Sequence, residues 1–70
     1  MTITAIIEAN QTLYGHGITP AEAAIIADLL THSSLDRQPS DFAILAPLVD
    51  DDRLDEADDL LGRARDIRNI

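Results

Sequence analysis

The chain has no cysteine and no lysine among its 70 residues. Without cysteine there is no disulfide framework and no thiolate ligand for a structural metal, the two supports that domains of this size commonly use. Well-packed helices, or association with a partner or a second copy, must therefore stabilise the fold. The absence of cysteine is also typical of a reducing compartment, so we expect a cytoplasmic protein.

The sequence also has no segment that resembles a signal peptide or a membrane span. Its N-terminus, MTITAIIEANQ, lacks a basic start and an uninterrupted apolar region. The longest apolar run, residues 42–49, is well below the roughly 20 residues that a membrane span requires. We therefore expect a soluble protein that does not enter a membrane.

Aromatic residues are scarce, and this shapes the expected core. Tyr14 and Phe42 are the only two aromatic residues, although 46% of the chain is hydrophobic. Such a chain is too apolar for an acidic disordered tail, and its core must consist of isoleucine, leucine and alanine. With a single valine, this composition favours helices over strands. The sequence predicts one all-α domain over residues 1–70, a compact bundle of three or four short helices.

The first two helices have clear local signals. Apolar residues at helical spacing predict a helix over residues 2–14, which Gly15-His16-Gly17 ends. Thr19, Pro20 and Glu22 then have the pattern of a capping box with proline at the first helical position. The second helix should continue to about residue 32, and its mostly apolar circumference predicts the central, buried position.

The second half of the chain is less clear. Ser40 is expected to cap the segment DFAILAPLV, in which Pro47 would cost about 3 kcal/mol as an interior helical residue. The helix is therefore either kinked at Pro47, or it ends near Leu45 and a new turn begins at Pro47. A last helix is predicted over residues 51–67, with an ion pair between Asp59 and Arg63.

The acidic segment, residues 50–59, dominates the charge of the chain. It carries seven of the 13 carboxylates, and the formal net charge is -8. These candidate partner-binding residues are Asp50, Asp51, Asp52, Asp55, Glu56, Asp58 and Asp59. In a helix, Asp52, Glu56 and Asp59 would share a face with Asp55 at spacings of about 5–6 Å. That spacing is of the same order as the roughly 3.4 Å between phosphates along a nucleic-acid strand.

The acidic segment has two other interpretations. It could be a solvated helix start whose charge matches the helix dipole, or it could be a metal site. A calcium loop of the EF-hand type needs oxygen ligands at its fifth and twelfth positions, where Leu54 and Leu61 stand. His16 and His32 have no catalytic partner at a recognisable spacing. We therefore expect no metal, no cofactor and no enzymatic activity.

Direct binding of nucleic acid is not expected, because the five arginines are scattered and the net charge opposes phosphate contacts. The apolar residues outside the helical stripes allow two interpretations. They either complete a closed core or leave a patch that marks a homodimer or a partner site. These residues are Ile18, Leu35, Phe42, Leu48, Val49 and Ile70.

One short motif resembles a known family. Ser34-Leu35-Asp36 is similar to the Asp-Ser-Leu attachment site of acyl carrier proteins, whose serine carries phosphopantetheine. That resemblance implies a small carrier or accessory protein with Ser34 as the modified residue. Ser33 stands where the family has aspartate, and Pro39 interrupts the helix that would follow.

In size and charge the chain also resembles phage-encoded anti-defence proteins that mimic nucleic acid, such as anti-CRISPR proteins. The leading hypothesis is a non-enzymatic acidic inhibitor that occupies a basic, nucleic-acid-binding site on a partner protein. The alternative is a toxin-neutralising or immunity-type partner protein, which would use apolar contacts as well as charge.

Overall fold

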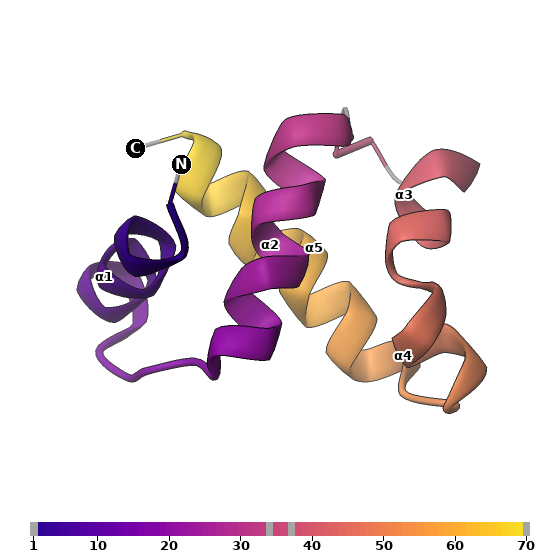
Figure 1. The fold of residues 1–70 in the computed structure, drawn as a ribbon, viewed down its shortest axis with the longest axis horizontal. Coiled ribbons are helices and arrows are strands. Elements are labelled where there is room, and N and C mark those ends of the chain that lie inside the picture. The colour runs from indigo at the N-terminus through magenta and orange to yellow at the C-terminus, as the bar shows by residue number, and fades with distance from the viewer. Residues whose placement is uncertain (1, 34, 37, 70) are drawn as a thin grey trace.

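Five α-helices form the part of the chain that the computed structural model describes, residues 2–33, 35–36 and 38–69 (Figure 1). They are α1 (Ile3–Tyr14), α2 (Pro20–His32), α3 (Pro39–Ile44), α4 (Ala46–Asp50) and α5 (Leu54–Arg68). These residues include no strand, so the all-α prediction is confirmed. None of the helices that they form combines the length and apolarity that crossing a membrane requires.

The first two helices begin and end where their local signals predict. The Thr2 side chain caps α1 by accepting the Ala5 N–H, and Gly15 ends the helix in the left-handed conformation at φ 73°. At the start of α2, the Thr19 hydroxyl accepts the Glu22 N–H while the Glu22 carboxylate accepts the Thr19 N–H. The predicted capping box is therefore confirmed.

The third predicted helix is divided in two. Leu45 joins α3 to α4, and Pro47 lies in the first turn of α4, which confirms the second of the two alternatives. The predicted cap at Ser40 is wrong, because Gln38 is the N-cap and Ser40 lies inside α3. Proline suits the first helical position, so Pro39 moves the cap to the residue before it.

The predicted helix over residues 51–67 begins instead at Leu54, because α4 ends in a Schellman motif. Asp52 adopts a left-handed conformation at φ 59°. Its N–H donates to the Val49 carbonyl at 3.1 Å, and the Arg53 N–H donates to the Leu48 carbonyl at 2.8 Å. This turn separates α4 from α5 and lets Leu48 reach the core, where it is 5% exposed.

The core lies where α2 packs against α5 and α1, with α3 and α4 closing the far end (Figure 1). Most of its apolar side chains come from α2 and α5. Of the apolar residues outside the predicted stripes, Leu35 and Leu48 are buried, and Ile18 and Val49 pack against the core. Phe42 is half-buried, and Ile70 lies outside the described residues. Four of the six residues therefore contribute to the core, whereas the closed-core interpretation requires all six.

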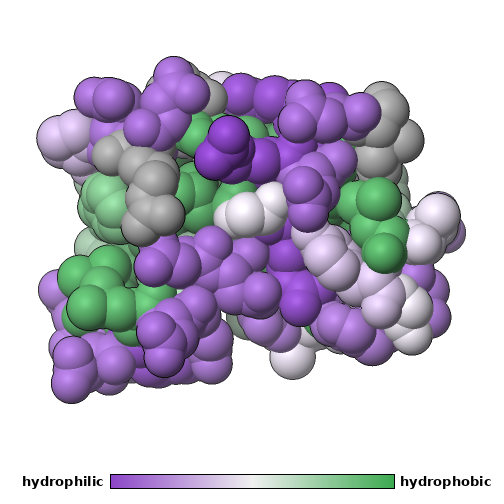
Figure 2. All heavy atoms as spheres, turned by 180° about the vertical axis from the view of Figure 1, so that it is seen from behind, coloured by the Kyte–Doolittle hydropathy of each residue, from purple (hydrophilic) through white to green (hydrophobic). Residues whose placement is uncertain are grey.

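Some apolar surface nevertheless remains. Ile3, Leu13 and Leu54 are the large apolar residues that stay exposed among those described, at 42%, 43% and 52%. From behind, the mostly hydrophilic surface shows separate apolar areas toward the α1 end and toward the α3 and α4 end (Figure 2). The exposed apolar surface is therefore divided over the molecule.

Candidate functional site

The acidic segment spans three structural elements, so its carboxylates do not form one helical row. Asp50 is the last residue of α4, and Asp51 and Asp52 lie in the turn that follows. Asp55, Glu56, Asp58 and Asp59 lie in the first two turns of α5. The predicted helical face that included Asp52 is therefore wrong. Asp55, Asp58 and Asp59 keep helical spacing on the exposed side of α5, while the aspartates of the turn extend the charge around its start.

Four of these seven carboxylates form no ion pair with an arginine that the structure describes. Asp50, Asp51, Asp52 and Asp55 are exposed, and none of them pairs with an arginine of the described chain. Glu56 pairs with Arg53. The predicted pair of Asp59 and Arg63 is confirmed, with Arg63 Nε 2.7 Å from Asp59 Oδ2. The segment therefore presents a dense, mainly unpaired negative charge to solvent.

Two hollows flank the pair of Arg53 and Glu56. The smaller, of about 260 Å³, is lined only by residues 52–56, including the exposed Leu54. The larger is a groove of about 450 Å³ between the start of α2, α4 and the start of α5. Arg53 and Glu56 line both hollows. The acidic segment is thus continuous with a partly apolar groove.

The groove includes residues that the sequence analysis did not assign to a site. Glu22 was assigned only to the capping box, and Ile25 and Pro47 only to helices, yet all three line the groove with Asp51 and Glu56. Glu22 and Glu56 are far apart in the sequence, and no local pattern relates them. Only the packing of α2 and α4 beside α5 brings these side chains together.

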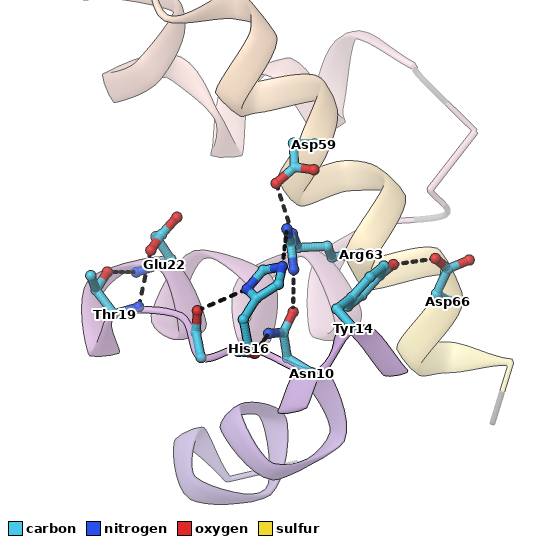
Figure 3. A network of polar contacts seen from close by, with 9 residues as sticks. Asn10, Tyr14, His16, Thr19, Glu22, Asp59, Arg63 and Asp66 are labelled. Atoms are coloured by element: carbon cyan, nitrogen blue, oxygen red, sulfur yellow. Dashed lines mark hydrogen bonds and ion pairs between the residues drawn. The ribbon is translucent and has the colours of Figure 1, made fainter. Parts of the chain in front are cut away.

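Arg63 anchors α1 and the following loop to the middle of α5 (Figure 3). Its side chain is only 13% exposed. Besides the Asp59 pair, it donates a 2.7 Å hydrogen bond to Oδ1 of the buried Asn10. Its guanidinium also lies over the Tyr14 ring, 4.4 Å from the centroid. The acidic side of α5 is therefore fixed relative to α1.

His16 joins the same network. Its Nε2 lies 3.4 Å from an Arg63 nitrogen, and its Nδ1 lies 3.2 Å from the Gly17 carbonyl oxygen. Because arginine can only donate, Nε2 is the acceptor and Nδ1 carries the proton. The Asn10 amide in turn donates to the His16 carbonyl at 2.9 Å. These contacts give His16 and Asn10 a structural role in holding the loop.

Tyr14 is an ionisable group of this network whose pKa is raised. Burial, then its hydrogen bond to Asp66 and the charge of that carboxylate, raise the pKa of Tyr14 to about 12, while Arg63 opposes the shift. The folded pKa thus exceeds the ordinary value of 10.0. The associated stabilisation is present below about pH 10 and is lost as the pH rises toward 12.

We expect the native protein to ionise its single tyrosine near pH 12, and the urea-unfolded protein to do so near pH 10. Ultraviolet difference absorbance of the phenolate reports Tyr14 alone, since the chain has no other tyrosine or tryptophan. In Asp66→Asn the midpoint of Tyr14 ionisation should fall part of the way toward pH 10, because burial still raises the pKa of Tyr14. Equal midpoints for the native and unfolded protein would contradict this prediction.

The remaining candidate sites gain no support from the geometry. Within residues 2–33, 35–36 and 38–69, no three acidic or histidine side chains are placed to hold a metal ion. His32 is exposed at the end of α2. Ser34, the candidate attachment residue of a carrier protein, lies outside the described residues. Comparison with protein families, with characterised proteins and with solved structures gives no match to this chain.

Proposed function

We propose that this protein is a non-enzymatic inhibitor whose acidic segment occupies a basic, nucleic-acid-binding site on a partner protein. The net charge of -8 would steer it toward such a site. The exposed carboxylates of the turn and of α5 would then take positions that phosphates otherwise fill. Inhibition would result from competition with nucleic acid and would weaken as salt rises.

The conformation of Asp52 is the observation that carries this proposal. Its φ of 59° places a carboxylate at the one position of the Schellman motif where glycine is normally favoured. Asp50 and Asp51 precede it directly, so three like charges lie together, and no arginine of the described residues forms an ion pair with any of them. The left-handed conformation and the repulsion between the three like charges both cost stability. A surface that is only solvated does not need carboxylates at positions where they lower stability. Their presence at these positions therefore supports a binding role.

The partner can be identified by capture from a host lysate with this protein as bait, followed by elution in rising salt. The purified partner is then bound to labelled nucleic acid, and fluorescence anisotropy measures whether this protein releases the label. Release would support the proposal. A complex that resists high salt would favour the toxin-neutralising class, and a ternary complex with nucleic acid still bound would contradict competition.

Asp52→Gly should change stability and binding in opposite directions. Relief of the left-handed conformation should raise the free energy of unfolding by about 0.5–1 kcal/mol. Loss of the carboxylate should weaken the partner complex about three- to ten-fold, mainly by lowering the association rate. Urea denaturation measures the first effect, and anisotropy competition measures the second.

Two asparagine variants provide matched controls for this prediction. Asp52→Asn removes the same charge without the conformational gain of glycine, so its binding loss should equal that of Asp52→Gly. Asp28→Asn removes one charge from the exposed face of α2 and should change affinity less than about two-fold. Equal losses for Asp52→Asn and Asp28→Asn would mean that only net charge matters and that the acidic segment is not the contact surface.

A further inference from the structure

The groove between α2, α4 and α5 is lined by both apolar and charged side chains, and we call its apolar residues the floor and its carboxylates the rim. Ile25, Pro47 and Leu48 contribute apolar surface, and Glu22, Asp51 and Glu56 contribute carboxylates. Arg53 is the only cation among its lining residues, all of which the structure describes. The lining therefore carries a net negative charge around an apolar centre, and its volume of about 450 Å³ is that of a typical ligand site.

We propose that this groove binds a peptide segment of the partner that carries an arginine or lysine beside a large apolar side chain. The apolar side chain would lie on the floor, and the cation would lie against the carboxylate rim. This inference rests on the proposed function, because it names the part of the basic partner that the acidic segment holds. Nucleic acid cannot be the occupant, since its phosphates would face three carboxylates.

The rim carboxylates come from three different elements, and one of them is fixed in place. Glu22 belongs to α2, Asp51 to the turn after α4, and Glu56 to α5. The Glu22 carboxylate accepts the Thr19 N–H at 3.0 Å, which holds its side chain at the start of α2. Carboxylates above an apolar floor attract a cation more strongly than carboxylates fully surrounded by water. Glu22 is thus held in position for a cationic, partly apolar segment.

Arg53 shows how a guanidinium occupies this rim. It pairs with Glu56, and the two side chains are 48% and 44% exposed. Exposed pairs of this kind contribute little net stability, so an incoming arginine or lysine can displace Arg53 at small cost. Arg53 therefore acts as an internal competitor. Removing it should strengthen binding of a basic segment instead of weakening it.

A library of random dodecapeptides, displayed on phage and selected against the immobilised protein at physiological salt, tests the proposal. Enriched peptides should place arginine or lysine next to leucine, isoleucine, phenylalanine or tryptophan. One enriched peptide is then synthesised with a fluorescent label, and its affinity for each variant is measured by anisotropy. Circular dichroism checks that every variant remains helical.

Arg53→Gln should bind this peptide about two- to five-fold more tightly than the original chain. Arg65→Gln is the matched control, because it removes the same charge about 18 Å farther along α5. That distance exceeds the screening length of about 8 Å, so its affinity should be unchanged. An equal gain in both variants would assign the effect to net charge and would overturn the groove as the site.

A second pair of variants tests the groove without changing a core residue: one variant fills the groove, and the other is its control. Ala21 and Ala43 are both exposed, but only Ala21 lines the groove. Ala21→Arg should weaken the peptide about ten-fold or more, by filling the groove and repelling the cation, whereas Ala43→Arg should change affinity less than about two-fold.

The outcomes also separate this inference from the proposed function. The enriched peptides could be basic but lack an apolar residue, and they could bind Ala21→Arg and Ala43→Arg equally. This result would contradict the groove as the binding site but would still agree with an acidic contact surface. Selection that enriches no basic peptide would count against both the groove and the proposed function. Basic, apolar peptides that lose affinity only in Ala21→Arg would support both.

Discussion

Leu60→Ala is expected to lower the free energy of unfolding by about 3–4 kcal/mol, the largest effect of any single change considered. Leu60 is fully buried in α5, within the core that α5 forms with α2. The truncation removes apolar contacts and leaves a cavity that the surrounding helices can only partly fill. A domain of this length has a total stability of about 4–10 kcal/mol, so the variant should approach unfolding at room temperature.

Urea denaturation followed by helical circular dichroism measures this loss. Leu54→Ala is the matched control, since it removes the same atoms from the same helix at a position that is 52% exposed. The control should lose less than about 0.5 kcal/mol. Similar losses in the two variants would mean that α5 does not pack through Leu60, and the arrangement of α5 against α2 would then be wrong.

Asp41→Ala is expected to have the second-largest effect, a loss of about 2–4 kcal/mol. Asp41 is completely buried, an unusual position for a carboxylate. Its side chain accepts the Ser33 hydroxyl and, at 3.1 Å, the Gln38 N–H. The Ser33 oxygen in turn accepts the Leu35 N–H at 2.9 Å. Alanine would leave the Ser33 hydroxyl and the Gln38 N–H, both between α2 and α3, without their acceptor.

Two further variants make this prediction specific. Asp41→Asn keeps one amide oxygen as an acceptor, so it should lose less stability than Asp41→Ala. Asp28→Ala removes an exposed carboxylate from α2 and should change stability by less than about 0.5 kcal/mol. Thermal and urea denaturation would compare the three. If Asp41→Ala were as stable as Asp28→Ala, the buried network would not hold α3 in place.

The local signals of the sequence predict the short-range features of the fold well. The Thr19 capping box, the Gly15 stop and the pair of Asp59 with Arg63 all involve groups no more than four residues apart. Interactions at such spacing depend mainly on backbone conformation and side-chain type, which the sequence specifies directly. The second half is harder, because Pro39 and Pro47 allow more than one division of the same apolar segment.

The start of α5 shows where local patterns are insufficient. An acidic run with good helical spacing predicts a helix from residue 51, yet α4 continues to Asp50 and Asp52 turns the chain. The deciding factor is burial of Leu45, which joins α3 to α4, and of Leu48, which the short α4 brings into the core. Periodicity alone cannot weigh that packing against the preference of acids for a helix start.

The sequence by itself determined the helical class of this protein, the limits of α1 and α2, and its concentrated negative charge. Only the tertiary structure decided which carboxylates line the same groove. The groove joins Glu22 to Asp51 and Glu56, and the Arg63 side chain reaches Asn10, 53 residues away. These contacts require α2, α4 and α5 to pack around one core. Their geometry follows from burial of apolar surface over the whole chain, which short-range patterns do not encode.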